Sequence, residues 1–204
     1  MFIELTEILR CPRDHAESYM VAAPIVMDGR RIVRGVVGCP ECQAEFPIVE
    51  GVAYFDAPLA PAGSPSRPPV SPAYDAAALA AFLNLSGPGG YVVLVGAGAR
   101  FAAELVVAVP GVHVVAVNAP PGVAPGPMLS LLVSRRGLPF KSASVRGVAL
   151  GAGHADEPWL ADASRILLPG LRLVVEDERA GPAGIAELAR GAGLLVGTKG
   201  ARTG

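Results

Sequence analysis

Apolar residues recur in short continuous runs over the last two thirds of the chain. Runs of this length, without polar alternation, are typical of strands that are covered on both faces of a parallel sheet. The clearest runs are residues 91–95, 113–117, 145–150 and 171–175, and weaker ones lie at 128–133 and 194–198. We therefore expect six mostly parallel strands in this region.

Segments rich in alanine and leucine separate these runs and predict helices. The expected helices cover residues 75–85, 100–109, 158–168 and 185–190. Pro158 suits the first turn of its helix, and Pro169-Gly170 is a stop signal after it. Alternating strands and helices predict an α/β fold with a doubly wound, mostly parallel sheet. The sheet should be shortened, because no clear strand pattern follows residue 198.

The first 56 residues have a different pattern, in which cysteines flank a predicted hairpin. Strands at 19–21 and 31–33 surround a turn at Asp28-Gly29, between Cys11-Pro12 and Cys39-Pro40-Glu41-Cys42. Two cysteine-bearing turns joined by a hairpin are the layout of a zinc ribbon. The sequence predicts a small β module of this kind.

The ligand set departs from a full ribbon, because Asp14 stands where a fourth cysteine is expected. Cys11, Cys39 and Cys42 with His15, or less favourably with Asp14, still supply the four ligands that zinc prefers. The alternative is a ribbon that has lost its metal and packs its thiols as small apolar groups.

Residues 57–72 contain six prolines and predict a semi-extended connector. The expected division is a zinc-ribbon-like module at 1–56, a linker at 57–72 and an α/β domain at 73–204, with the two modules folding separately.

Composition limits the partners. The net charge of −1 gives no overall basic field for nucleic acid, although a local patch remains possible from Arg10, Arg13, Arg30, Arg31 and Arg34. Charged residues make up only 17% of the chain and the mean hydropathy is +0.45, which indicates either a buried protein interface or compositional drift. Three cysteines, no secretory signal and no membrane span predict a cytoplasmic protein.

A glycine loop follows the first strand of the α/β region. Gly96-Ala97-Gly98 should lie at the carboxyl edge of the sheet, where such folds bind ligands, beside the N–H groups of the next helix. Phe101 replaces the third glycine of a dinucleotide fingerprint, which disfavours a nicotinamide enzyme.

Several segments in order resemble class I (Rossmann-like) S-adenosylmethionine-dependent methyltransferases. They are the glycine loop, Leu138-Pro139-Phe140 with the strand at 145–150, and the helix, Pro-Gly turn and strand at 159–175. The resemblance implies a methyltransferase fold, with S-adenosylmethionine held by Gly96, Ala97, Gly98 and Asn118.

The same resemblance implies that this cofactor site is degenerate. Leu94, Asn118 and Arg146 stand at positions that are usually acidic, and Arg100 replaces a glycine. Asparagine carries no charge and matches two ribose hydroxyl donors poorly. Residues 1–56 resemble the small zinc-ribbon proteins that activate methyltransferases, through Phe46-Pro47-Ile48, the Glu50-Gly51 turn and a final apolar strand.

No catalytic residue can be assigned from the sequence. His154 with Asp156 and Glu157 is either a general base with nearby carboxylates or a polar loop that caps the next helix. Arg100 is either an anion clamp or a cover for its helix end. We expect a non-catalytic interaction or scaffold subunit of a larger assembly; the alternative is an active methyltransferase acting on RNA or protein.

Overall fold

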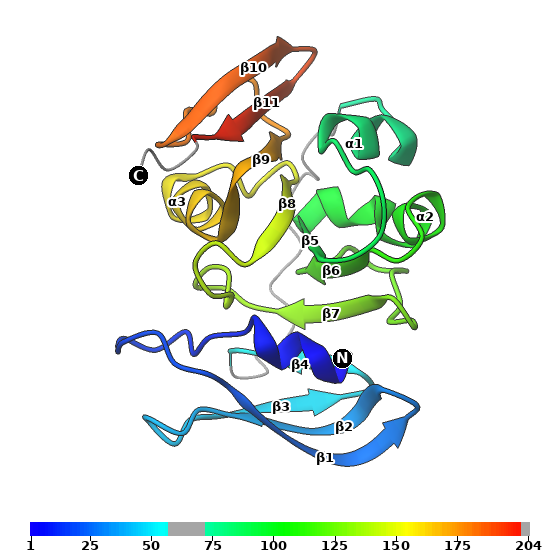
Figure 1. Ribbon diagram of the computed structural model, residues 1–204, viewed down its shortest axis with the longest axis vertical. Helices are drawn as coiled ribbons and strands as arrows, with labels where there is room; N and C mark the ends of the chain where they lie inside the picture. The colour runs from blue at the N-terminus through cyan, green and yellow to red at the C-terminus, as the bar shows by residue number, and fades with distance from the viewer. Residues whose placement is uncertain (57–71, 201–204) are drawn as a thin grey trace.

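The computed structural model describes residues 1–56 and 72–200. The linker predicted at 57–72 therefore lies outside the described residues, except for Pro72. Eleven strands form one sheet, in the order β1-β2-β3-β4-β7-β6-β5-β8-β9-β11-β10 (Figure 1).

The N-terminal part consists of a short 3-10 helix, η1 (Ile3–Glu7), and four antiparallel strands. The strands are β1 (Val21–Asp28), β2 (Arg31–Gly38), β3 (Glu45–Val49) and β4 (Val52–Tyr54). Asp28 pairs with Arg31 across the β1–β2 turn, so the predicted hairpin is present. Its first strand begins at Val21, two residues later than expected.

The α/β part contains the predicted parallel strands. They are β5 (Tyr91–Val95), β6 (His113–Val117), β7 (Leu129–Val133), β8 (Val145–Leu150) and β9 (Leu167–Val175). All pair in parallel, in the order β7-β6-β5-β8-β9. The doubly wound, mostly parallel sheet predicted from the apolar runs is confirmed.

In the described part of the chain, helices lie on both sides of this sheet, but not every pair of successive strands is joined by one (Figure 1). They are α1 (Ala76–Phe82), the 3-10 helix η2 (Gly96–Phe101) continuing into α2 (Ala102–Ala108), and α3 (Glu157–Ile166). The side chain of Asp75 accepts a hydrogen bond from Ala78 N–H and caps α1. The connections from β6 to β7 and from β9 to β10 contain no helix. The domain is therefore shortened by the loss of helices.

Two expectations for the C-terminal region were wrong. Residues 185–190 form a strand, β10 (Ile185–Gly191), where a helix was expected, and it pairs with antiparallel β11 (Leu194–Lys199). β11, which was predicted, also pairs with β9, so β10 is the additional strand that the sequence did not reveal. In addition, α3 ends at Ile166, two residues earlier than expected. Pro169-Gly170 lie within β9 and do not form a separate turn, and the β8–β9 register shifts between Val145 and Gly147.

The two parts of the chain share one sheet and one core, so the expectation of separate folding does not match their packing. β4 pairs in parallel with β7, with Ala53 opposite Leu132. One cluster of buried residues contains Leu5 and Phe46 together with Leu138 and Phe140. The ribbon-like part thereby covers the β7 edge of the sheet.

Candidate functional site

The glycine loop lies where the sequence placed it, at the carboxyl end of β5. Gly96 has a positive φ of 56°, a conformation that favours glycine. However, the ring of His154 packs directly on it: a Cβ built at Gly96 would lie 2.3 Å from His154 Nδ1. The imidazole therefore fills the space through which a ligand would approach the Gly96 backbone.

His154 is held in this position by its surroundings. Its backbone N–H donates to the carbonyl of Gly151 at 3.1 Å, and its ring meets Trp159 edge-on at 4.7 Å between centroids. Burial lowers the pKa of His154 below its usual value. Nδ1 has no hydrogen-bond partner among the described residues. The Asp156 carboxylate acts on the His154 pKa in the opposite direction to burial, and Asp156 and Glu157 stand at the start of α3.

The loops after β5 and β8 also touch through their backbones. A Cβ built at Gly151 would lie 2.0 Å from the backbone nitrogen of Gly98 and 2.7 Å from the carbonyl oxygen of Val95. Gly151 N–H donates to that same carbonyl at 2.9 Å. The two loops therefore leave no room between them beside Gly98.

Asn118, at the end of β6, uses both ends of its side-chain amide within the protein. Its Nδ2 donates to the carbonyl of Ser134 at 2.6 Å, and its Oδ1 accepts from Ser134 N–H at 3.0 Å. Ser134 Oγ in turn donates to the carbonyl of Gly137. This pair ties the ends of β6 and β7 together and occupies the groups that were expected to meet ribose hydroxyls.

Arg100 has an anionic partner inside the protein. Its guanidinium lies 2.5 Å from Oε1 of Glu176, whose side chain is only 1% exposed. Glu176 also accepts hydrogen bonds from Tyr74 Oη at 2.7 Å and from Ala152 N–H at 2.9 Å. Burial, followed by the hydrogen bond to Glu176, raises the pKa of Tyr74. The network joins the edges of β5, β8 and β9 and neutralises the arginine.

Sequence reasoning missed the role of Glu176. Its place immediately after the β9 run was the available signal, because the carboxyl ends of parallel strands converge on one edge.

The residues expected to hold the methyltransferase-type cofactor are already engaged within the protein. Of the residues expected to hold it, Gly96 is covered by His154 and Asn118 is engaged by Ser134. The cavities described in this structure lie elsewhere, beside Phe46, Ala103 and Met128. In this arrangement the residues do not fit S-adenosylmethionine.

The predicted metal ligands, by contrast, come together. The donor atoms of Cys11, His15, Cys39 and Cys42 all lie within 4.8 Å of one another, and Asp14 is outside this group. Cys11 Sγ is 3.6 Å from Cys42 Sγ, and Cys39 Sγ is 3.4 Å from His15 Nε2. Ligands around a tetrahedral zinc ion, with Zn–S near 2.3 Å and Zn–N near 2.0 Å, are separated by about 3.8 Å and about 3.5 Å respectively. The group therefore fits zinc.

Neighbouring groups orient these ligands. His15 Nδ1 is 2.7 Å from the carbonyl of Ala16, which favours the tautomer with a free Nε2 facing the sulfurs. Burial alone would raise the pKa of the Cys39 thiol, but the N–H groups of Cys42 and Glu41 lower it to about 6. Both features suit a metal ligand.

The arginines that were considered as a nucleic-acid patch do not all border one cavity. Arg13 borders one cavity, whereas Arg30 and Arg31 border another, beside the β1–β2 turn. Arg30 pairs with Glu4, and Arg31 pairs with Asp28. No helix in the described part of the chain has the length and apolar character needed to span a membrane.

No family model matches the chain, and no curated protein matches it. Its fold is similar to that of solved methyltransferases. A chain in the complex of the Haloferax volcanii Trm112 methyltransferase activator with a methyltransferase is 24% identical over 49% of this chain and 50% of that one, with a TM-score of 0.39. The geranyl diphosphate C-methyltransferase of Streptomyces coelicolor is 18% identical over 49% and 41%, at 0.37. A Haemonchus contortus phosphoethanolamine-type N-methyltransferase is 14% identical over 49% and 27%, at 0.40.

The chain spans half or less of the length of these proteins, and likenesses this distant say nothing of activity. In the sheet itself, antiparallel β11 lies between β9 and β10, next to the parallel series β7-β6-β5-β8-β9. The protein is methyltransferase-like in fold, with a cysteine and histidine cluster near its N-terminus.

Proposed function

We propose that this protein is a non-catalytic, methyltransferase-like subunit that serves as an interaction scaffold in a larger assembly. The observation that carries the proposal is His154 packed on Gly96, where a Cβ would be 2.3 Å from the imidazole. The side-chain bonds of Asn118 and the Arg100–Glu176 pair support it. Each replaces an expected ligand contact with a contact inside the protein.

The ribbon-like part supplies the second half of this proposal. Cys11, His15, Cys39 and Cys42 hold one zinc ion, which fixes the two turns that flank the β1–β2 hairpin. Zinc acts here in structure, because four protein ligands leave no open coordination position.

The partner surface is the outer edge of the ribbon. Exposed large apolar side chains in the described chain gather on β1 and just before it, namely Tyr19, Val21, Ile25, Val26 and Met27. β1 is the end strand of the sheet, so its outer backbone groups are free of strand partners. A protein partner that covers this strand would bury both features.

A specific observation favours the alternative of an active S-adenosylmethionine-dependent methyltransferase acting on RNA or protein. His154 Nδ1 is a buried polar atom without a partner among the described residues, and a bound ligand would satisfy it. This alternative requires the imidazole to leave Gly96 when the cofactor arrives.

Calorimetric titration with S-adenosylmethionine and S-adenosylhomocysteine separates the two functions. We expect no heat of binding for the natural chain, and weak or no binding for His154→Ala, because Asn118 remains engaged. Micromolar binding by the natural chain that Gly96→Arg abolishes would overturn the scaffold proposal. Zinc content, measured in the same preparations, verifies that each variant is folded.

A further inference from the structure

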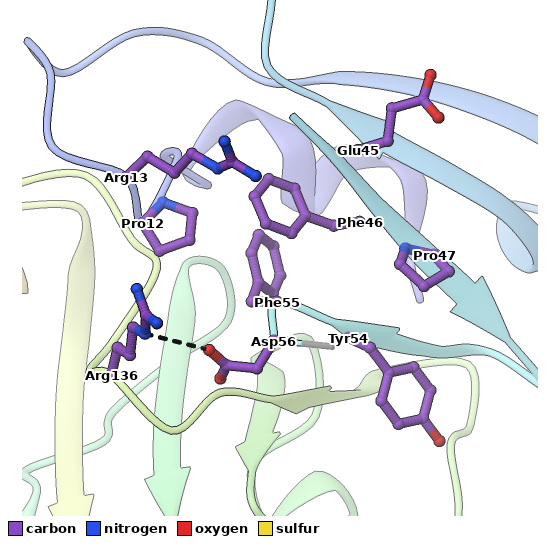
Figure 2. Close-up of a pocket in the computed structure, with 9 residues that line it drawn as sticks. All are labelled: Pro12, Arg13, Glu45, Phe46, Pro47, Tyr54, Phe55, Asp56 and Arg136. Carbon is purple, nitrogen blue, oxygen red and sulfur yellow. Dashed lines mark ion pairs between the residues drawn. The ribbon is translucent and has the colours of Figure 1, made fainter. Parts of the chain in front are cut away.

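A separate cavity of about 380 Å³ lies where the cysteine cluster, β3, β4 and the loop after β7 meet (Figure 2). It is lined by Pro12, Arg13, Glu45, Phe46, Pro47, Tyr54, Phe55, Asp56 and Arg136. None of these residues belongs to the glycine-loop edge, the carboxyl edge of the sheet beside Gly96 and Gly98. Three regions that are distant in sequence build the cavity, namely residues 12–13, the β3–β4 hairpin and Arg136. Small-molecule sites are typically about 300–1,000 Å³ in volume.

One side of the cavity is aromatic and fixed in place. The rings of Phe46 and Phe55 lie one above the other in Figure 2, with centroids 4.9 Å apart. Both side chains are part of the main core, so their positions are set by packing. Phe46 is 6% and Phe55 is 3% exposed, so narrow ring edges, extended by Pro12 and Pro47, form the apolar wall of the cavity.

The other side carries two guanidinium groups. Arg13 extends toward the Phe46 ring in Figure 2, and it has no ion pair among the described residues. Arg136 is 85% exposed, and its Nε is 4.0 Å from Oδ1 of Asp56. The other oxygen of Asp56 accepts a hydrogen bond from the Arg135 N–H, which anchors the carboxylate at the edge of the cavity.

The remaining acidic residue, Glu45, is exposed on β3, and its carboxylate points away from the two rings (Figure 2). The groups that face the space between the rings and the loop after β7 are therefore the two arginines and the anchored Asp56. Two planar guanidiniums can hold a dianionic phosphate by paired hydrogen bonds.

We propose that this cavity binds a phosphate carried on a small aromatic group. The aromatic group packs against Phe46 and Phe55, and the phosphate lies between Arg13 and Arg136. A free small molecule and a phosphorylated side chain at the surface of a partner share this chemistry. The proposal does not depend on the function proposed above, because it uses no residue of the glycine-loop edge.

The test is calorimetric titration of the full, zinc-loaded chain with phenyl phosphate. Inorganic phosphate lacks the ring and benzyl alcohol lacks the charge, so we expect each to bind at least about tenfold more weakly. Arg136→Ala and Arg13→Ala should each weaken phenyl phosphate by about tenfold or more. Arg34→Ala removes the same charge from an exposed position on β2 outside the cavity and should leave the affinity unchanged.

Equal binding of phenyl phosphate and inorganic phosphate, or full affinity in both arginine variants, would overturn the proposal. Arg136 lies far from the cysteines in sequence, so its variant keeps the test valid even if Arg13→Ala disturbs the zinc turn. Free phosphotyrosine and the same residue within a short peptide then identify the source. If the peptide binds more tightly than free phosphotyrosine, the ligand is a protein partner. If the two bind equally, the ligand is a small molecule. If neither displaces phenyl phosphate, the result counts against the site.

Discussion

His113 is a histidine inside the core, and its surroundings keep it neutral. It is 4% exposed, its Nε2 is 2.9 Å from Ser130 Oγ, and its ring stacks on Phe2 at 4.8 Å. Burial, and next the nearby α-amino group of Met1, lower the pKa of His113 from 6.5 to about 4. Between these two pKa values, His113 is therefore protonated in the unfolded chain and neutral in the folded protein.

This residue should make the protein sensitive to acid in a defined window. Between pH 6.5 and about 4 the unfolded chain binds more protons at this site, so the free energy of unfolding falls as the pH falls, by up to about 1.4 kcal/mol per pH unit. His113→Gln keeps a donor for Ser130 and removes the titration. Urea unfolding midpoints measured at pH 7.5, 6 and 5 should decline more steeply in the natural chain than in the variant. Parallel declines in the two proteins would contradict the assignment to His113.

Gly151 shows how closely the loops at the carboxyl edge are packed. A Cβ placed on Gly151 would lie 2.0 Å from the Gly98 nitrogen, so the two loops can pack this closely because residue 151 has no side chain. Gly151→Ala should force the β5 and β8 loops apart and lower stability by several kcal/mol, about 2–4, because the obstructing atoms are backbone.

Gly181 is the matched control for that substitution, because a Cβ there would meet no atom of the described residues within 4 Å. Thermal melting should show a large loss for Gly151→Ala and almost no change for Gly181→Ala. A Gly151→Ala protein that melts like the natural chain would show that the two loops are separated in solution.

At the level of elements, the apolar runs predicted most of the sheet because burial on both faces leaves a clear record in sequence. Residues 91–95 and 113–117 match β5 and β6 residue for residue. β10 was misassigned because Ile185 to Arg190 consists largely of good helix formers, and pairing with β11 overrides that preference. Gly191 and Gly193, which surround its turn, were the missed hairpin signal.

The same reasoning explains what was predicted at the candidate sites. The cysteine cluster could be predicted, because short turns keep Cys11 near His15 and Cys39 near Cys42, and the hairpin between them brings the pairs together. The closed glycine loop could not. Its cover, His154, is distant in sequence from Gly96, and the direction of its ring depends on Trp159 and the β8 loop.

Removal of the metal should destabilise the ribbon. The cluster joins the turn before the β1–β2 hairpin to the turn after it, and binding energy for such a site contributes to folding. We expect one zinc ion per chain by mass spectrometry under native conditions, and a fall in melting temperature of several degrees with a strong chelator. Cys39→Ser should lower zinc content and stability together, whereas Asp14→Ala, outside the cluster, should change neither. Full zinc content in Cys39→Ser would refute the ligand set.

For the whole molecule, the decisive contact is between β4 and β7, because it turns two sequence regions into one sheet. Ala53 is fully buried on β4 opposite Leu132, and the core on that side contains residues from both regions. Without residues 1–56, β7 would become an open edge with an uncovered apolar face, a combination that promotes aggregation. Residues 73–204 expressed alone should therefore be poorly soluble.

The two regions should nevertheless associate without a covalent link, since strand pairing and core packing hold them together. Residues 1–56 and 73–204 produced as separate chains in one cell should co-purify as a one-to-one complex. Ala53→Glu, which buries a charge at the β4–β7 pairing, should abolish the complex, whereas Val49→Glu, at a position on β3 that is 49% exposed, should preserve it. If 73–204 alone is soluble and melts as the full chain does, the ribbon is an accessory to the fold. If it depends on 1–56, the ribbon is part of the fold itself, and any partner that covers β1 is bound to the same continuous sheet as the closed glycine loop.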